Sequence, residues 1–375
     1  MSSPIKILTI LGARPQFIKA ATVSRAISLH NEKGYLRIQE VIVHTGQHYD
    51  FKMSNIFFDE MNIPHPDYQL ECGNLNHGAM TGRMLGEIEE IILKEKPDHV
   101  LVYGDTNSTL AGALAASKLH VPLSHVEAGL RSFNMAMPEE VNRILTDRVS
   151  SHLFCPSATA VDNLKKEGFP FQTANSNTQN IYIVGDVMYD ATLFYANIAK
   201  NTVFLKNWDL CEKNYVLCTV HRAENTDNPE RLISIFSALQ EIAKSLPVVL
   251  PLHPRTQNLL KMKGGSKLLE SITILEPVSY LEMQRLEMGA KVILTDSGGI
   301  QKEAFFHGVP CITLRDETEW VETVDLGWNQ LVGSDQENLF SAFNKSKDTL
   351  PNISSSVYGC GDAATKCVEH LMSLK

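Results

Sequence analysis

The chain has 375 residues, more than one hydrophobic core usually supports, and this length predicts two domains. Hydrophobic residues make up 43% of the chain and charged residues 21%, which is typical of a soluble globular protein. The formal net charge of −9 argues against a nucleic-acid-binding protein, although it allows a local basic pocket for an anionic ligand.

The sequence predicts neither a membrane segment nor a disulfide framework. No apolar run reaches the roughly 20 residues needed to span a bilayer, and the N-terminus carries no signal-peptide pattern. The seven cysteines are scattered and include no C-x-x-C pair, which indicates reduced thiols and no zinc site. We therefore expect a cytoplasmic protein without a membrane or nucleic-acid partner.

Short apolar runs alternate with longer amphipathic segments in two series. This alternation predicts parallel sheets with right-handed helical crossovers, an α/β fold of two doubly wound, Rossmann-like domains. We expect the domains at residues 1–180 and 181–355, with a helix at about 356–375 that packs back on the first domain. The predicted strands are Ile5–Leu11, Val41–His44, His99–Tyr103, Leu123–Val126 and His152–Cys155, then Tyr215–Val220, Val248–Leu252, Ile272–Leu275, Val292–Thr295 and Cys311–Leu314. Ligands of such sheets bind beyond the carboxyl ends of the strands, so functional residues should directly follow the strands.

The first strand leads into the cationic turn Gly12–Lys19, with the sequence GARPQFIK. The turn contains neither the G-x-G-x-x-G fingerprint nor a Walker motif, which argues against dinucleotide binding and ATPase chemistry. Arg14 and Lys19 are candidates for binding an anion. The alternative is that both are solvated side chains of a loop and a helix.

Carboxylates directly follow the third and fourth predicted strands, and two more lie at the start of a later helix. Glu127 directly follows a strand in an apolar region, where a carboxylate costs desolvation energy unless it is paired or functional. Asp105, Glu127 and one of Glu139 and Glu140 could converge, and acids in a poorly hydrated site suit proton abstraction and donation. Alternatively, Asp105 caps a helix, and the two later glutamates interact with a helix dipole.

The second series contributes cationic residues at corresponding positions. His221 directly follows a strand and is a candidate for acid/base catalysis or phosphate binding. His253 and Arg255 follow the next strand and form a second cationic pair for the substrate. The 13 histidines show no metal-binding spacing, and no G-x-S-x-G frame indicates a hydrolase nucleophile.

A phosphate-binding turn is predicted at Asp296–Glu303. It joins a buried strand to a helix, so free backbone N–H groups should lie at the helix N-terminus, where Gly298 and Gly299 permit close approach of a ligand. Glu303 lies about one turn into the helix, where it could bind a ribose hydroxyl. The alternative is an ordinary strand-to-helix turn with an Asp or Ser N-cap.

Taken in order, these motifs resemble those of the non-hydrolysing UDP-N-acetylglucosamine 2-epimerase family along nearly the whole chain. The matching segments are Gly12–Lys19, Gln47-His48, Gly104-Asp105-Thr106, His125–Arg131, Pro138–Arg143, Val184-Gly185-Asp186, His221–Asn225 and Asp296–Glu303. The ordered set is far more specific than any one member. The resemblance implies a GT-B-type fold, with two Rossmann-like domains and the active site in the cleft between them.

The resemblance also implies a reaction that inverts carbon 2 of the sugar. Proton removal at carbon 2 accompanies anti elimination of UDP to give a 2-acetamidoglucal, and UDP adds back after reprotonation on the other face. Neither a nicotinamide nor a metal is implied as cofactor, and the implied assembly is a homodimer. The implied catalytic residues are Asp105, Glu127, Glu139 and His221; the implied UDP-sugar-binding residues are Arg14, Lys19, Ser297, Gly298, Gly299 and Glu303.

Three departures from the usual family pattern bear on the substrate. Gln16 stands where the family usually has Glu, Thr318–Glu322 reads TEWVE in place of TERPE, and the loop before Pro138 is shorter. These features resemble the branch acting on UDP-2,3-diacetamido-2,3-dideoxy-glucuronate, a precursor of O-antigen lipopolysaccharide and capsular polysaccharide. Gln16 removes a negative charge that would oppose a substrate carboxylate, whereas Trp320 removes a cation. Conversion of UDP-GlcNAc to UDP-ManNAc and epimerisation of the diacetamido sugar therefore both remain open.

Two other functions fit the same architecture. A GT-B glycosyltransferase would need an acceptor, but glycosyl transfer does not require three acids around carbon 2. A UDP-sugar-binding or regulatory protein would use the turn at Ser297–Gly299 without turnover. The epimerase interpretation accounts for Asp105, Glu127 and Glu139 together, and it is our leading prediction.

Overall fold

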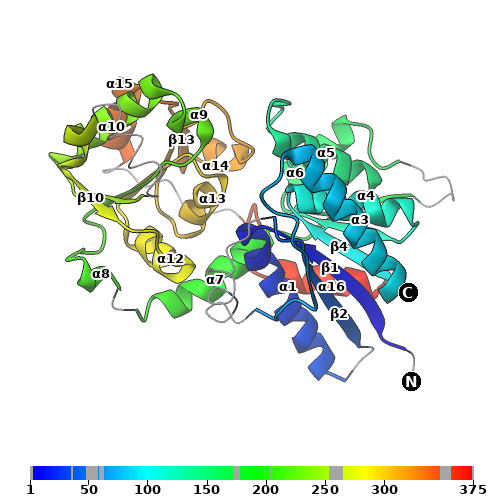
Figure 1. Ribbon diagram of the computed structural model, residues 1–375. Helices are drawn as coiled ribbons and strands as arrows, with labels where there is room; N and C mark the ends of the chain where they lie inside the picture. The colour runs from blue at the N-terminus through cyan, green and yellow to red at the C-terminus, as the bar shows by residue number, and fades with distance from the viewer. Residues whose placement is uncertain are drawn as a thin grey trace. The chain divides into compact units, whose positions relative to one another are not determined.

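The computed structural model describes residues 3–34, 37–47, 58, 63–171, 178–202, 204–252, 265–346 and 356–373. The chain divides into two compact units: unit 1 is Met1–Ala191 with Ser356–Lys375, and unit 2 is Thr192–Ser355. Each unit is a parallel sheet covered by helices (Figure 1). The predicted α/β fold with two Rossmann-like sheets is confirmed.

Unit 1 is built on a seven-stranded sheet with the order β3-β2-β1-β4-β5-β6-β7, in which every neighbouring pair is parallel. The first six strands follow the 3-2-1-4-5-6 order of a Rossmann fold, so the topological switch point lies between β1 and β4. The strands are β1 (Ile5–Leu11), β2 (Ile38–His44), β3 (Tyr68–Gln69), β4 (His99–Tyr103), β5 (Leu123–Val126), β6 (His152–Cys155) and β7 (Asn180–Ile183).

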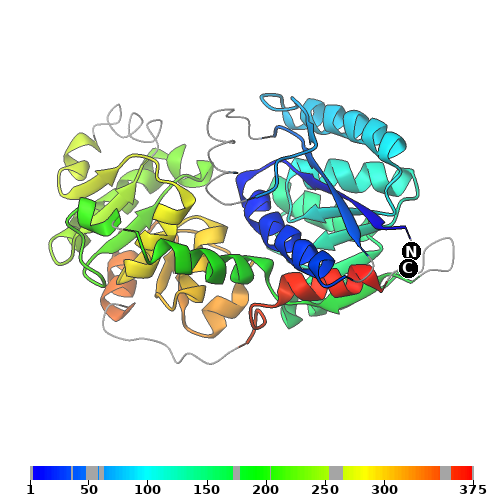
Figure 2. The same cartoon turned by 90° about the horizontal axis from the view of Figure 1, so that it is seen from below.

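Helices cover both faces of the unit 1 sheet. On one face α16 (Ala363–Met372) lies along α1 (Arg14–Glu32), although the two are far apart in sequence (Figures 1 and 2). The other face carries α3 (His77–Glu95), α4 (Asn107–Lys118) and α5 (Pro138–Val149); α6 (Ala158–Lys166) follows β6. Helix α3 buries Met84, Ile88, Ile91 and Ile92, the spacing of one helical face.

Unit 2 repeats this design with the strand order β10-β9-β8-β11-β12-β13 and a switch point between β8 and β11. Helices α10 and α15 pack on one side of its core, and α8, α12 and α13 contribute to a separate apolar cluster. The strands are β8 (Val216–Thr219), β9 (Val248–Pro251), β10 (Ile272–Leu275), β11 (Val292–Thr295), β12 (Cys311–Thr313) and β13 (Asn329–Leu331). Helix α7 (Val187–Ala199) contains the boundary between the units. The helices that follow it are α8 (Phe204–Asn207), α9 (Ala223–Thr226), α10 (Pro229–Ala243), the 3-10 helix η1 (Gly265–Leu269), α12 (Tyr280–Gly289), α13 (Gly298–Phe306), α14 (Val321–Asp325) and α15 (Gln336–Ser346).

All ten predicted strands are present, and most of their bounds agree to within a residue. The prediction missed β3, β7 and β13, which have two to four residues each and lie at sheet edges, where each pairs with one neighbour. Such short strands are only partly buried, so their sequences lack the continuous apolar run that identified the central strands.

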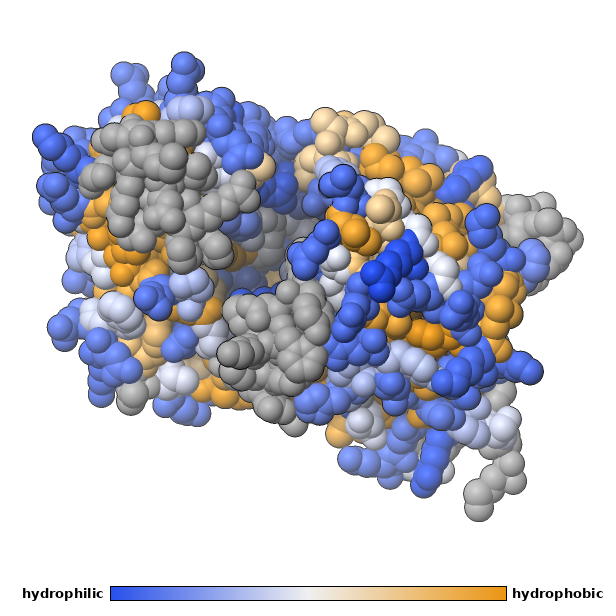
Figure 3. Space-filling view, viewed as in Figure 1, coloured by the Kyte–Doolittle hydropathy of each residue, from blue (hydrophilic) through white to orange (hydrophobic). Residues whose placement is uncertain are grey.

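The visible surface is mainly polar, with apolar residues scattered among the polar ones (Figure 3). Across the described ranges, no helix combines the length and the apolar character that a membrane crossing requires.

Buried histidines in unit 1 make its stability sensitive to acid. His99 and His152 begin β4 and β6 and are both buried, with ring centroids 5.3 Å apart. Burial, followed by the charges of His99 and His370, lowers the pKa of His152 to about 4 from 6.5. Because the unfolded chain then binds protons more readily, His152 contributes stability that is present above pH 6.5 and lost as the pH falls toward about 4.

We therefore expect unfolding by urea to become easier as the pH falls below 6.5, with a loss of about 2 kcal/mol from His152 by about pH 5. Asp190 acts in the opposite direction, because burial raises its pKa to about 6. The test is therefore the difference between the protein and its His152→Gln variant across this range. A difference that does not change with pH would contradict the prediction.

Candidate functional site

Several candidate residues lie after the strands that flank the topological switch point of each unit. In unit 1, Lys19 lies on α1 after β1, and Asp105 follows β4. In unit 2, His221 follows β8 and Ser297 follows β11. The carboxyl ends of strands at a switch point are where doubly wound sheets bind ligands. Each unit thus carries its own cluster of candidate residues.

In unit 1, Lys19 and Glu127 form a buried ion pair. Their exposed fractions are only 8% and 7%, so Lys19 is not a solvated side chain. Gly104 passes beside the pair: a Cβ atom at this position would lie 3.2 Å from Glu127 Oε2 and 3.3 Å from Lys19 Nζ. Glu127 has φ of +75°, a left-handed conformation that costs energy for a residue with a side chain. Surrounding structure therefore imposes the position of this carboxylate.

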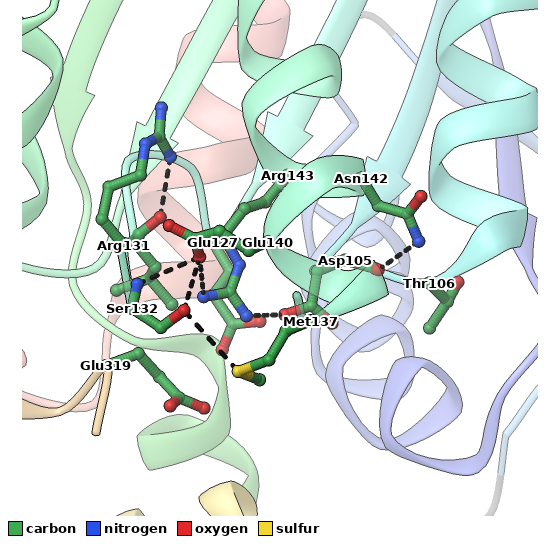
Figure 4. A network of polar contacts seen from close by, with 12 residues as sticks. Asp105, Thr106, Glu127, Arg131, Ser132, Met137, Glu140, Asn142, Arg143 and Glu319 are labelled. Carbon is green, nitrogen blue, oxygen red and sulfur yellow. Dashed lines mark hydrogen bonds and ion pairs between the residues drawn. The ribbon is translucent and has the colours of Figure 1, made fainter. Parts of the chain in front are cut away.

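Asp105 pairs with Arg143 of α5, and Asn142 Nδ2 donates to the Asp105 carbonyl over 2.9 Å (Figure 4). The N-cap of α4 is Thr106, whose Oγ1 accepts from the Thr109 backbone N–H. The alternative interpretation of Asp105 as a helix cap is therefore wrong. Its carboxylate remains partly exposed, next to a guanidinium.

Glu139 and Glu140 have different environments although they are adjacent on α5. Glu140 is fully buried and accepts hydrogen bonds from Ser132 N, Ser132 Oγ, Phe133 N and Arg143 Nη1 at 2.9–3.0 Å (Figure 4). Glu139 is exposed. Glu140 is thus a structural anchor for the loop before α5, whereas the side chain of Glu139 is left exposed.

This difference predicts unequal effects of two conservative replacements on stability. Glu140→Gln places an amide N–H against N–H donors, and we expect it to lower stability by about 3 kcal/mol. Glu139→Gln should change stability by less than about 0.5 kcal/mol, because the side chain is exposed. Urea unfolding of the two variants compares these effects directly. Equal stabilities would show that Glu140 does not anchor the loop.

Gln16 is used entirely within unit 1. Its Oε1 accepts from Gly12 N and Ala13 N, and its Nε2 donates to Tyr103 O and Thr109 Oγ1, all at 2.8–3.0 Å. These bonds connect the turn after β1 to the end of β4. All four of these bonds are made within the protein, so Gln16 can affect a ligand only because its amide is uncharged or because it holds the two segments together.

In unit 2, Asp296 connects the segments that follow β8 and β11. Its buried carboxylate accepts from the backbone N–H groups of His221 and Arg222 and from Asn225 Nδ2. Its Oδ1 also lies 3.2 Å from His221 Nδ1, while the His221 side chain is 57% exposed. A carboxylate at Nδ1 orients the imidazole and leaves Nε2 for a ligand. Local sequence placed Asp296 only in a turn and did not predict this contact, although its position directly after a strand was the available signal.

The first turn of α13 has no side-chain cap. Ser297 occupies the N-cap position but makes no side-chain capping bond, so the N–H groups of the first turn have no partner from that side chain. A Cβ at Gly298 would lie 2.7 Å from Glu319 Oε1, so a larger residue there would have to displace the Glu319 carboxylate. Gly299 is exposed, and a Cβ there would meet nothing closer than Ser297 Oγ at 3.9 Å.

Glu303 is held by its neighbours on α12. Its Oε1 accepts from Tyr280 Oη over 2.9 Å and from Gln284 Nε2 over 2.8 Å. Burial, followed by the charge of Glu303, raises the pKa of nearby Glu287 well above its usual value.

The remaining candidates differ in how much the structure says about them. Arg14 is half-buried at the start of α1. His253 and Arg255 lie outside the described residues. Among the residues that are described, no group of three or more His, Cys, Asp or Glu side chains could hold a metal ion.

Two Rossmann-like units with candidate residues at their switch points place the chain among enzymes with a GT-B-type fold. A family model described as UDP-N-acetylglucosamine 2-epimerase matches residues 30–372. The chain belongs to this family, whose members are UDP-sugar 2-epimerases and hence isomerases.

Individual relatives support the assignment. The chain is 54% identical to UDP-2,3-diacetamido-2,3-dideoxy-D-glucuronate 2-epimerase of Pseudomonas aeruginosa, covering 99% of this chain and 100% of the relative. It is 48% identical to UDP-N-acetylglucosamine 2-epimerase of Methanococcus maripaludis, covering 91% of each. The crystal structure of the Methanocaldococcus jannaschii UDP-GlcNAc 2-epimerase in complex with UDP-GlcNAc and UDP superimposes with a TM-score of 0.87 at 44% identity, covering 98% of this chain and 100% of that chain.

Proposed function

We propose that the protein epimerises carbon 2 of a UDP-2-acetamido sugar by elimination and re-addition of UDP. The observation that carries this proposal is the set of carboxylates at one sheet edge of unit 1: Glu127 paired with Lys19, Asp105 paired with Arg143, and the exposed Glu139. Inversion needs a base for one face of carbon 2 and an acid for the other, and a single carboxylate cannot serve both.

In the proposed first stage, a unit 1 carboxylate takes the carbon 2 proton. The electron pair forms the carbon 1–carbon 2 double bond as the bond between carbon 1 and the UDP oxygen breaks. The N-terminus of α13 binds the departing diphosphate, because its N–H groups and helix dipole favour negative charge. His221, oriented by Asp296, donates a hydrogen bond or proton to the leaving oxygen.

In the proposed second stage, a different carboxylic acid protonates carbon 2 on the opposite face, and the UDP oxygen attacks carbon 1. The enzyme must retain UDP between the stages, since loss of UDP would release the glycal. Glu303 supports this retention by accepting a hydrogen bond from the ribose. The protons and electron pairs balance without an oxidant or a metal.

Two substrates are supported by different observations. The 2,3-diacetamido-glucuronate derivative is supported by the relative at 54% identity and by the neutral Gln16. Trp320 stands where the family usually has Arg, but a cation is still present nearby. The ammonium of buried Lys302 lies 3.9 Å from the centre of the Trp320 ring. UDP-GlcNAc is supported by the relatives at 47–48% identity that carry that name.

Proton NMR in D2O tests the reaction and the substrate together. Each sugar nucleotide is incubated with the protein, and deuterium at carbon 2 and the 2-epimer are followed over time. Exchange and product with one sugar establish the reaction and identify that substrate. Binding of UDP without exchange at carbon 2 of either sugar would overturn the epimerase proposal in favour of a binding protein. Transfer of the sugar to an acceptor without exchange would favour a glycosyltransferase.

A further inference from the structure

A second set of charged residues lies beneath the unit 1 carboxylates and is not used in the proposed reaction. Asp147 of α5 is fully buried and lies 2.7 Å from His125 Nδ1. Its other oxygen accepts from Gly129 N over 3.1 Å and from Arg131 Nη1 over 2.7 Å. Arg131 also pairs with Glu167 through two bonds of 2.6 and 2.8 Å.

The hydrogen bonds of His125 determine its protonation state. Nδ1 lies 2.7 Å from a carboxylate oxygen, and Nε2 lies 2.7 Å from the carbonyl oxygen of Gly104. Neither an ionised carboxylate nor a carbonyl can donate a hydrogen bond. With Asp147 ionised, this pattern of two acceptors fits a ring that carries a proton on each nitrogen, an imidazolium.

Charge balance supports this assignment. With a charged His125, the group contains two cations, buried His125 and buried Arg131, and two anions, buried Asp147 and the exposed Glu167 that also binds Arg131. A buried charge is tolerated when it is paired and hydrogen-bonded. Burial alone would raise the pKa of Asp147, but hydrogen bonds and positive charge from His125 and Arg131 outweigh burial and hold this pKa below its usual value.

The same bonds connect the segments that carry the proposed catalytic residues. Gly104 directly precedes Asp105, and its Cα lies beside the Lys19–Glu127 pair. Gly129 lies two residues after Glu127 and has φ of +81°. Asp147 lies on the helix that carries Glu139. Displacement of the Gly104 carbonyl or the Gly129 amide would therefore move Asp105 or Glu127.

We propose that a buried imidazolium at His125, held by Asp147, positions the turns of Asp105 and Glu127. This proposal rests on the function proposed above. His125 and Asp147 are positioning residues, because their described contacts are with the protein's own backbone and side chains. If His125 lost one proton, a nitrogen lone pair would face the Gly104 carbonyl oxygen, and their repulsion would displace the turn before Asp105.

The protonation state can be measured without any variant. In the protein labelled with 15N-histidine, the His125 resonances at neutral pH should show a proton on both ring nitrogens. A neutral tautomer in the wild-type protein would overturn the proposal. The signal is assigned from its loss in His125→Gln. This measurement does not depend on activity, so an inactive wild-type protein would refute the proposed function and leave the protonation result standing.

The positioning role is tested with Asp147→Asn, which keeps the shape of the side chain and removes its charge. We expect kcat to fall about 100-fold while KM for the accepted UDP-sugar changes less than about threefold, because misplaced catalytic groups slow chemistry more than binding. His152→Gln is the matched control, since it alters a buried histidine of the neighbouring strand, away from the carboxylates, and should leave kcat unchanged. An unchanged kcat in Asp147→Asn, or an equal loss in His152→Gln, would overturn the positioning role.

Discussion

Glu127→Gln is expected to lower kcat for epimerisation about 10³-fold, the range that a positioned acid or base contributes. The glutamine keeps the size of the side chain and removes its ability to take or give a proton. The same change leaves Lys19 buried without its carboxylate, which should cost about 3 kcal/mol of stability. Deuterium incorporation at carbon 2 measures the rate, and urea unfolding measures the stability.

A double variant separates these two effects. Lys19→Met combined with Glu127→Gln removes both charges, so we expect it to recover most of the lost stability and none of the lost rate. Glu90→Gln, an exposed glutamate of α3, is the matched control for the loss of one carboxylate. A rate that recovers together with stability would show that Glu127 acts through folding and not through proton transfer.

Gly299→Asp is expected to weaken UDP binding about 100-fold, because it places a carboxylate at the helix N-terminus that is proposed to hold the diphosphate. The fold should not suffer, since the new side chain enters open space. An acidic residue in the first turn of a helix even stabilises it, by about 0.5 kcal/mol. Binding and stability should therefore change in opposite directions, as measured by calorimetric titration with UDP and by thermal unfolding.

Gly299→Asn distinguishes the charge of the new side chain from its size. Asparagine has nearly the same volume as aspartate and no charge, so UDP affinity should fall much less than in Gly299→Asp. Equal losses in the two variants would mean that close approach of the ligand matters more than charge. Unchanged affinity in both would place the diphosphate elsewhere.

The two glutamates of α5 show what the sequence left undecided. Both lie in the first turn of the helix, so the local sequence pattern predicts the same environment for both. Their difference arises because the loop at Ser132 and Phe133 folds back onto Glu140 and surrounds its carboxylate with donors. The path of that loop is a tertiary property, and no helix or strand period describes it.

Local sequence also could not predict which charged residues form pairs. Lys19 and Glu127 are 108 residues apart, Asp105 and Arg143 are 38 apart, and His221 and Asp296 are 75 apart. Each pair forms because strand order brings distant strand ends or helices together. The left-handed backbone of Glu127 has the same origin, since the surrounding structure imposes a conformation that the residue itself disfavours.

The sequence by itself determined the central strands, the parallel α/β class and the chain positions of the candidate residues. Apolar runs, their alternation with helical segments and the polar groups that end them are local signals, because they depend on residues only a few positions apart. Tertiary structure alone decided which carboxylates are paired, which glutamate is exposed, that Asp296 contacts His221 and that His125 lies between Asp147 and the Gly104 carbonyl. These properties depend on which strand ends are neighbours in the sheet, and sheet order is set by packing across the whole domain.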